Sequence, residues 1–357
     1  MVRYFFVMVV MVSAGVLGLS GCAGAQRIEG KPWHHTTAGF RNIEGSPPRG
    51  ASFSDRVDFF STRLWASATG GWDDTWPDDH VYTPEQVQES LALLAESDSL
   101  MWIGHATFLL HLDGRWILTD PFFAERASPV SWAGPKRAIM PPLSVSALPK
   151  IDIIVVSHNH YEHLCASTIE AMPNKETVTV VVPLEMGVFF RERGYKRVIE
   201  LDWWQSVDVD GITVHMMPAV HWSRRGLFDG NEMLWASFAI ESASQMIYHS
   251  GDTDMHPTLF TDIGRYLGRC DVALMGIGAY EPRSIMRGSH MLPEDAVTAG
   301  QQLGCRSLIG QHWGTIRLSN EPFMEPEERF FRAAQKVGQH VEDMAIGQSL
   351  RLMSSDP

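Results

Sequence analysis

Three histidines and a carboxylate lie within six residues, directly after an apolar segment. The segment Ile153–Val156 has the composition of a buried strand, and it leads into His158, His160, Glu162 and His163. Imidazole nitrogens and carboxylate oxygens are the usual protein ligands of zinc and related divalent ions. In an extended or turning segment His158 and His160 project to the same side and can share one ion, whereas Glu162 and His163 can face a second. The pattern predicts a metal site.

A metal ion needs more ligands than this short segment supplies, and three candidates occur later in the chain. Each of His221, Asp252 and His312 follows an apolar segment that reads as a strand. Taken singly, they have ordinary structural interpretations as a surface histidine, a turn-forming aspartate beside Gly251 and a core histidine. In this order, each at the end of a strand, they predict one metal-binding constellation.

The elements that must position these residues are short strands separated by turns. Strands are expected over residues 100–103, 107–112, 116–119, 153–156, 178–182, 212–217, 234–240, 246–249, 272–275 and 308–309. Helices are expected over 54–66, from 84 onward, and over 184–193, 293–303 and 326–337. Asp113-Gly114 predicts a tight hairpin. Many strands with a few helices predict an α/β fold of two packed sheets with the helices outside.

The N-terminus has the pattern of a secretory signal. Arg3 precedes an apolar run that extends to Leu19 and ends in Ser20-Gly21-Cys22. This ending resembles the lipobox of bacterial lipoproteins, which predicts lipidation of Cys22, and the following Ala23 favours the outer membrane. We therefore expect a signal peptide over 1–21, a tether over 22–50 and a single folded domain with an N-terminal helical extension over 51–357.

Composition sets limits on partners and redox chemistry. The 357-residue chain has a formal net charge of −13, which argues against a broad nucleic-acid-binding face. Besides Cys22 it contains Cys165, Cys270 and Cys305, none with a zinc-type spacing. Three buried thiols are favoured over a disulfide, although an oxidising periplasm permits one, and the sequence does not pair the cysteines.

The chain resembles the metallo-β-lactamase superfamily, and within it the branch containing N-acyl-phosphatidylethanolamine-hydrolysing phospholipase D and its bacterial relatives. The superfamily pattern is H-x-H-x-D-H, followed by a histidine, a bridging aspartate and a last histidine. The resemblance covers roughly residues 85 to 345 and rests on blocks that occur in order: 102–107, 118–121, 126–129, 134–137, 157–161, 200–204, 221–222, 251–253, 278–283 and 312–315.

The resemblance implies an αββα sandwich and a site with two zinc ions. His158, His160 and His221 would hold the first ion, His163 and His312 the second, and Asp252 would bridge them. Glu162 would complete the second site, and His290 would line the active site. A metal-bridging hydroxide would then attack a phosphodiester. Asp120, in Thr-Asp-Pro, is expected to accept a hydrogen bond from a ligand imidazole.

Two positions depart from the family pattern. Glu162 stands where the family has aspartate, and its additional methylene predicts a second site that is weaker or prefers another ion. Asp254 and Met255 stand where relatives often have Gly-Tyr, so one wall of the pocket differs.

Three functions remain open at this stage. The first is a membrane-anchored zinc phosphodiesterase of phospholipase D type, with an N-acyl-phosphatidylethanolamine-like or related lipid as substrate. The second is a lactonase or ester hydrolase on the same metal site. The third is a non-catalytic envelope lipoprotein with an impaired metal site. The expected location is the cell envelope, anchored by lipidated Cys22 to the outer membrane and facing the periplasm. The sequence leaves the oligomeric state open.

Overall fold

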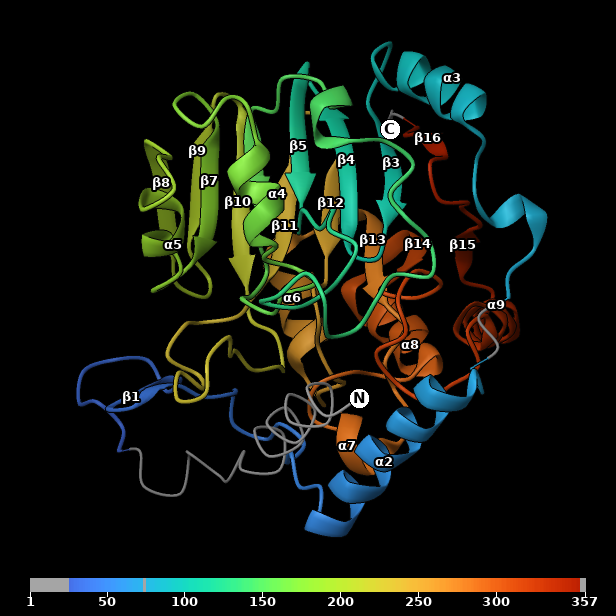
Figure 1. Cartoon of the computed structure of the whole chain (residues 1–357). Helices are drawn as coiled ribbons and strands as arrows, with labels where there is room; N and C mark the ends of the chain where they lie inside the picture. The colour runs from blue at the N-terminus through green and yellow to red at the C-terminus, as the bar shows by residue number, and fades with distance from the viewer. Residues whose placement is uncertain (1–25, 73–74, 354–357) are drawn as a thin grey trace.

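The structure, a computed structural model, describes residues 26–72 and 75–353. It contains two large sheets that face each other, with helices on their outer sides (Figure 1). The predicted signal peptide and Cys22 lie outside the described residues. Within the described residues, no helix combines the length and the apolar character needed to cross a membrane. The predicted αββα sandwich is confirmed.

The first sheet has the strand order β16-β3-β4-β5-β6-β7-β8, antiparallel from β16 to β5 and parallel from β5 to β8. Its strands are β3 (Ser99–Gly104), β4 (Thr107–Leu112), β5 (Arg115–Thr119), β6 (Ile153–Val155), β7 (Thr179–Pro183), β8 (Arg197–Leu201) and β16 (Ser349–Arg351). Asp113 and Gly114 connect β4 to β5 with φ angles of 46° and 74°, as a two-residue hairpin of the predicted kind requires.

The second sheet has the order β15-β14-β13-β12-β11-β10-β9, antiparallel from β9 to β12 and parallel from β12 to β15. Its strands are β9 (Ser206–Val209), β10 (Ile212–Met217), β11 (Ser237–Glu241), β12 (Met246–His249), β13 (Cys270–Gly276), β14 (Cys305–Gln311) and β15 (His340–Glu342). The expected strand 234–240 begins only at Ser237, because the peptides of Leu234 and Ala236 bond to Leu184 and Ser157 outside the sheet.

The helices are α2 (Phe53–Thr69), α3 (Pro84–Leu94), α4 (Ala166–Ala171), α5 (Gly187–Arg191), α6 (Leu259–Leu267), α7 (Arg283–Met286), α8 (Pro293–Leu303) and α9 (Glu325–Val337). Most of them cover the outer faces of the two sheets, whereas α2 and α7 pack against each other at one edge of the sandwich (Figure 1). Thr83 and Gln86 form the predicted capping box of α3. Gly338 ends α9 with a φ of 69°, a conformation that glycine adopts without steric cost.

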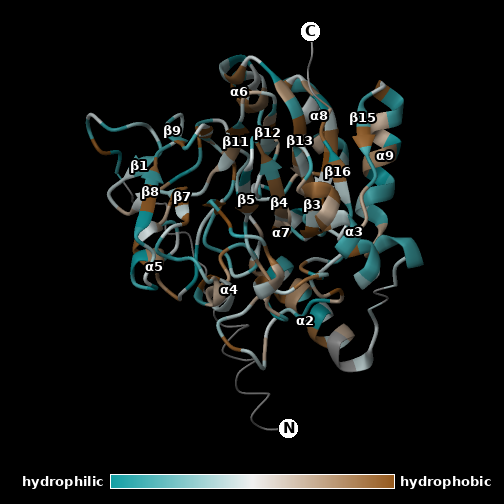
Figure 2. Ribbon diagram, turned by 90° about the horizontal axis from the view of Figure 1, so that it is seen from above, coloured by the Kyte–Doolittle hydropathy of each residue, from teal (hydrophilic) through white to brown (hydrophobic). Residues whose placement is uncertain are grey.

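Hydrophobic side chains fill the space between the sheets and the space under the helices. Trp102, Phe108, Phe238 and Tyr248 are fully buried in the inter-sheet cluster. Figure 2 shows the hydrophobic colour gathered on the central strands, with hydrophilic positions along α9. This packed core holds the strand ends rigidly and thereby fixes the positions of the loops that follow them.

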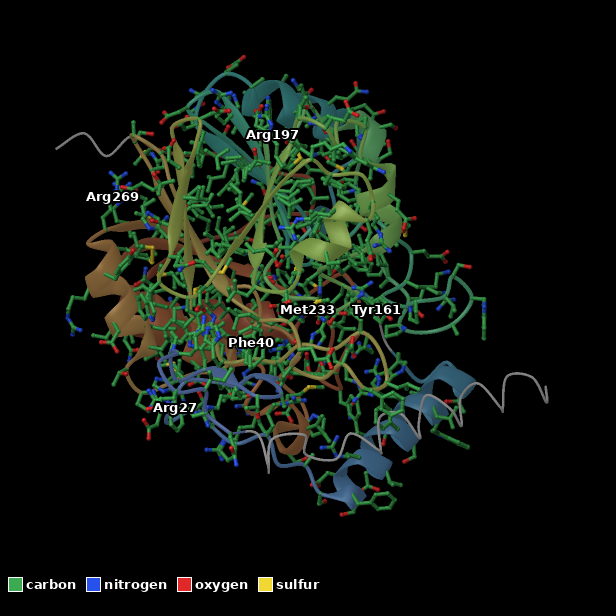
Figure 3. All side chains as sticks on the ribbon, turned by 90° about the vertical axis from the view of Figure 1, so that its left-hand side faces the viewer. Arg27, Phe40, Tyr161, Arg197, Met233 and Arg269 are labelled. Carbon is green, nitrogen blue, oxygen red and sulfur yellow. A yellow bond between two sulfur atoms is a disulfide. The ribbon has the colours of Figure 1, made fainter. Side chains whose placement is uncertain are left out.

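The expected tether over 22–50 contacts the folded body in its described part. Residues from 26 onward include a small hairpin of β1 (His35–Thr36) and β2 (Gly39–Phe40). The Phe40 side chain is buried in the main core cluster, and its peptide N–H donates to the Asn231 carbonyl at 2.7 Å. In Figure 3 Phe40 lies where this segment meets the body, and Arg27 lies farther out along it.

The expectation of three buried thiols is wrong. Cys270 and Cys305 form a disulfide, and Cys165 is the free, buried cysteine of the described residues. The two bonded cysteines are direct partners in the register of the parallel strands β13 and β14, 4.4 Å apart at Cα. The sequence contains no signal for this pairing, because register is a property of the assembled sheet.

We expect the Cys305→Ser variant to lose about 3 kcal/mol of unfolding free energy, because the disulfide closes a loop with a sequence separation of 35 residues. Denaturant unfolding with and without reductant measures the change, and reductant should destabilise the wild type but not the variant. Thiol titration of the denatured wild type should give two more thiols after reduction. An unchanged count would contradict the disulfide.

Candidate metal centre

The predicted ligands come together at one edge of the sandwich. His158 and His163 follow β6 of the first sheet, whereas His221, Asp252 and His312 follow β10, β12 and β14 of the second. The arrowheads of β5, β7 and β10 point to this edge in Figure 1, on the side where the N-terminal segment, α2 and α7 lie. The site therefore depends on both sheets and on the packing between them.

Asp252 is at the centre of the constellation. Its Oδ2 lies 3.2 Å from Nε2 of His163 and from Nε2 of His312, 3.6 Å from Nε2 of His158 and 3.7 Å from Nε2 of His221. The carboxylate is 3% exposed. Burial alone raises the pKa of Asp252, but His163 and His312 outweigh it and hold that pKa well below its usual range.

The donor atoms form two overlapping groups around Asp252. His158, His160 and His221 form one group with it: Nδ1 of His160 lies 2.8 Å from Nε2 of His158 and 3.3 Å from Nε2 of His221. Glu162, His163 and His312 form the other group with Asp252. The structure thus brings together all seven residues that the sequence predicts as metal ligands.

Unpartnered donor atoms show that these residues fit metal ions. Nε2 of His163, Nε2 of His312 and both oxygens of Asp252 are buried and have no hydrogen-bond partner among the described residues. A buried polar atom without a partner is costly, and several converging on one point are rare outside metal sites. Imidazole and carboxylate donors at this spacing suit two divalent ions that share Asp252.

Glu162 lies at the edge of the second group. Its carboxylate is among the donor atoms that lie within 4.8 Å of one another there, and Oε1 is 4.0 Å from Nδ1 of His160. Burial raises the pKa of Glu162 above its ordinary value. The longer side chain therefore reaches the site that the family fills with aspartate, next to both donor groups.

Asp120 fixes the orientation of several site residues. It accepts hydrogen bonds from His163 Nδ1 at 2.8 Å, His249 Nε2 at 3.0 Å, and the Ser157 peptide and hydroxyl at 2.6 and 2.7 Å. The expected hydrogen bond to a ligand imidazole is present. Because His163 donates through Nδ1, its Nε2 is the ring nitrogen directed at Asp252 and would be the one to bind a metal ion there. Burial raises the pKa of Asp120, but the imidazoles of His163 and His249 lower it more.

His221 and His158 are oriented in the same way. Nδ1 of His221 donates to the Ser289 carbonyl at 2.9 Å, and Nδ1 of His158 lies 2.9 Å from the Ser157 hydroxyl. The His221 peptide also forms a reciprocal pair with Asn42, whose Nδ2 donates to the His221 carbonyl at 2.9 Å and whose Oδ1 accepts from its N–H at 3.0 Å. These contacts leave Nε2 of both histidines facing Asp252.

The structure places several residues in the site that the sequence analysis did not predict there. The His105 ring centroid lies 4.0 Å from that of His312, and His105 forms a further donor group with His163 and His312. Its motif, Gly104-His105-Ala106-Thr107, was the available signal. Asn42, His249 and Ser289 carried no such signal, because their contacts join distant parts of the chain. The ring of His290 lies 5.2 Å from those of His221 and His312, inside the site as expected.

Asp254, one of the departures from the family pattern, fastens a wall of the site. Its Oδ2 accepts a hydrogen bond from the Gly288 N–H at 2.6 Å and lies 3.3 Å from Nη2 of Arg283. Gly288 immediately precedes Ser289 and His290, which face the metal ligands. Asp254 thus holds the segment after α7 against the metal centre.

We expect Glu162→Ala to lower the affinity for the second metal ion on the order of a hundredfold, because the variant removes one of the donor groups of that ion. Glu162→Asp should keep or raise the occupancy, since the carboxylate remains and matches the family pattern. Elemental analysis and competition with a chromophoric chelator measure both variants. Asp252→Ala, which should release both ions, and the exposed Glu170→Ala serve as controls. Equal second-site affinity in Glu162→Ala and wild type would remove Glu162 from the ligand set.

Comparison with known proteins shows the family to which this chain belongs. The model of the beta-lactamase superfamily domain matches residues 115–313. N-acyl-phosphatidylethanolamine-hydrolyzing phospholipase D 1 of Caenorhabditis elegans is 38% identical over 239 residues, which are 64% of this chain and 67% of that protein. A metal-dependent hydrolase of Caldivirga maquilingensis is 33% identical over 247 residues, 68% of this chain and 92% of that protein.

The solved structure of an isothiocyanate hydrolase from Delia radicum gut bacteria shares the fold, with a TM-score of 0.57 and 20% identity over 72% of this chain and all (100%) of that one. A Mycobacterium tuberculosis protein is 41% identical over 242 residues, and the match covers 66% of this chain. The chain spans 64% of the length of that mycobacterial protein, less than two thirds. The chain belongs to the metallo-β-lactamase superfamily, and its relatives there include N-acyl-phosphatidylethanolamine-hydrolysing phospholipase D.

Proposed function

We propose that this protein is a zinc-dependent phosphodiesterase of phospholipase D type, with an N-acyl-phosphatidylethanolamine-like or related phospholipid as substrate. The observation that carries the proposal is the largely buried group of five imidazoles and two carboxylates, one of which is the central Asp252. It occurs in a chain that is 38% identical to a protein named for hydrolysing such a lipid. A second support is the order of the ligands along the chain, which follows the superfamily pattern at every position except Glu162.

Two zinc ions fit the two donor groups. When bound, such ions lower the pKa of water to about 7 and stabilise negative charge on a phosphodiester oxygen. The protein's own residues do the positioning. Asp120 and Ser289 hold the tautomers of His163 and His221, so that the donor atoms are aimed before substrate arrives. Such preorganisation lowers the barrier because little rearrangement remains for the reaction step.

His290 lies where it can contact substrate. Its ring is close to His221 of the first donor group and to His312 of the second. Burial is the main cause that lowers the pKa of His290 well below its ordinary value. The imidazole is therefore neutral at pH 7 and can offer one N–H to a phosphodiester oxygen.

A cationic side chain lies next to the first donor group. The Arg49 guanidinium stacks over the Trp222 ring at 4.0 Å, and that ring lies 4.3 Å from the ring of His160. Burial is the largest cause that lowers the pKa of His160, and the positive charge of Arg49 lowers that pKa further. A guanidinium beside the metal ligands suits a substrate with an anionic phosphodiester and offers no such advantage to a neutral lactone.

The location proposed for the protein is the cell envelope. The N-terminal signal pattern and Cys22 support export and lipid attachment, with the outer membrane favoured by Ala23. The Cys270–Cys305 disulfide adds support, because disulfides persist mainly in oxidising compartments such as the periplasm. A lipid anchor would keep the site near its substrate, although one chain alone binds a membrane weakly.

The proposal is tested by incubating the zinc-loaded protein with a matched panel: an N-acyl-phosphatidylethanolamine, phosphatidylethanolamine, an acyl-homoserine lactone and a neutral carboxylic ester. We expect hydrolysis of the phosphodiester that releases phosphatidic acid, detected by mass spectrometry, and its loss in Asp252→Ala. Turnover of the lactone or ester alone would support the second candidate instead. A protein that holds two ions and turns over nothing in the panel would refute the phosphodiesterase.

We expect Arg49→Gln to raise KM for the phosphodiester about tenfold, since a hydrogen bond to a charged group contributes about 1.5 kcal/mol. kcat should change less, because Arg49 is placed to bind rather than to react. Initial rates over a substrate range give both constants. Arg265→Gln, whose guanidinium pairs with Asp262 on the exposed side of α6, is the matched control. An unchanged KM would remove Arg49 from substrate binding.

We expect Cys22→Ser to remain unprocessed or to lose its membrane fraction, because the variant lacks the thiol that accepts lipid. Fractionation of cells, gel mobility and metabolic labelling with a palmitate analogue follow the outcome. Cys165→Ser, which removes the free cysteine buried in the folded body, is the control. If the Cys22→Ser variant is labelled and fractionates in the same way as wild type, the lipoprotein assignment is contradicted.

A further inference from the structure

Two histidines and an aspartate form a second cluster of metal-ligating side chains, apart from the site described above. His34 and His35 belong to the N-terminal segment, and Asp202 follows β8. Nε2 of His34 lies 2.5 Å from Oδ1 of Asp202, and Nε2 of His35 lies 2.7 Å from Oδ2. The three donor groups thus converge although 167 and 168 positions separate the histidines from the aspartate.

A turn of the backbone before His35 allows both histidines to reach the same carboxylate. Neighbouring residues of an extended chain point to opposite sides, so consecutive histidines normally cannot reach one carboxylate. Here the His35 N–H donates to the Pro32 carbonyl at 3.1 Å, which turns the chain and brings the two rings to 4.5 Å between centroids. Both imidazoles consequently present Nε2 to the same carboxylate.

The cluster is sheltered and held in place. The His34 ring stacks on Trp203 at 4.1 Å between centroids, and the Phe40 ring packs edge-on against His35 at 5.2 Å. The side chains of His34, His35 and Asp202 are 7%, 13% and 14% exposed. The three side chains are therefore largely protected, and their small exposed fractions leave access for an ion or a water ligand.

We propose that His34, His35 and Asp202 form a third metal site, which binds a first-row divalent transition ion such as Zn²⁺. Two imidazoles and one carboxylate suit such ions, whereas Ca²⁺ and Mg²⁺ prefer oxygen ligands alone. In a tetrahedral shell with bonds of 2.0–2.1 Å, ligand atoms stand about 3.4 Å apart. Both nitrogen–oxygen distances in the cluster are shorter than this, so the carboxylate has to withdraw from the two imidazoles to admit the ion, with water as the fourth ligand.

The role of this third ion is structural. It joins the N-terminal segment to the loop after β8, as a metal clip that closes a long stretch of chain. The same segment carries Asn42, which bonds to the peptide of the metal ligand His221, and Glu44, whose carbonyl accepts from His256 Nε2 at 3.0 Å. The third site thus fastens the segment that supports the first ligand group, and contributes no donor to that group.

The test is the metal content of the full chain and its variants. Protein stripped with chelator is refilled with Zn²⁺ and desalted, and zinc per chain is determined by elemental analysis. Asp202→Asn and His34→Gln should each contain one zinc fewer than wild type. His215→Gln is the matched control: His215 pairs with Glu241 at 3.0 Å and belongs to no donor group of three among the described residues. The control should equal wild type.

Thermal unfolding separates the third site from the catalytic centre. Zn²⁺ should still raise the Tm of Asp252→Ala, in which the third site is intact, and the rise should be smaller when Asp202→Asn is added to that variant. Co²⁺ in place of Zn²⁺ should give visible absorption from the third site in Asp252→Ala. Equal zinc content in wild type, Asp202→Asn and His34→Gln would overturn the proposal and leave a hydrogen-bonded cluster. Neither zinc content nor Tm depends on catalysis, so these measurements test the third site whether or not the protein is a phosphodiesterase.

Discussion

The structure depends on one constraint, which is that a buried carboxylate has to be matched by positive charge. Asp252 is 3% exposed, and its Oδ2 has four imidazole nitrogens within 3.7 Å but no hydrogen-bond partner among the described residues. Burial lowers the pKa of His163, but Asp252 and Asp120 outweigh it and raise that pKa well above its ordinary value, so a protonated His163 can supply positive charge. Neutral imidazoles alone cannot. Divalent ions between Asp252 and the imidazoles can, and the donor set fits them.

The constraint explains why both sheets contribute to one edge. Asp252 comes from the second sheet, and the imidazoles nearest to it come from both, so the site forms only after the sheets have packed. Asp120, at the end of β5, then connects the first sheet to the second through His163 and His249. The hydrogen bond from His163 Nδ1 to Asp120 leaves Nε2 of His163 directed at Asp252, where a metal ion would bind.

The N-terminal segment supports the site from outside the part of the chain that the family model matches. Residues 26–50 lie outside the part matched by the family model, yet Asn42 supports the peptide of His221 and Arg49 lies over Trp222 beside His160. The segment therefore serves two purposes in our proposals, support of a metal ligand and binding of an anionic substrate. Its attachment through His34, His35 and Asp202 stabilises both.

The sequence by itself determined much of the local structure and indicated which residues are the candidate metal ligands. The strands β4, β10 and β12 and the helix α8 have the bounds that their apolar patterns predict, and the ligand histidines were recognisable because they follow such strands. Strands β8 and β9 were missed because their burial is partial and their apolar signal is correspondingly weak. The Cys270–Cys305 disulfide, the Asn42 support and the cluster at Asp202 were decided only by the tertiary structure. Each joins residues through strand register or through a contact across many positions, and no local pattern encodes which distant partner a side chain will meet.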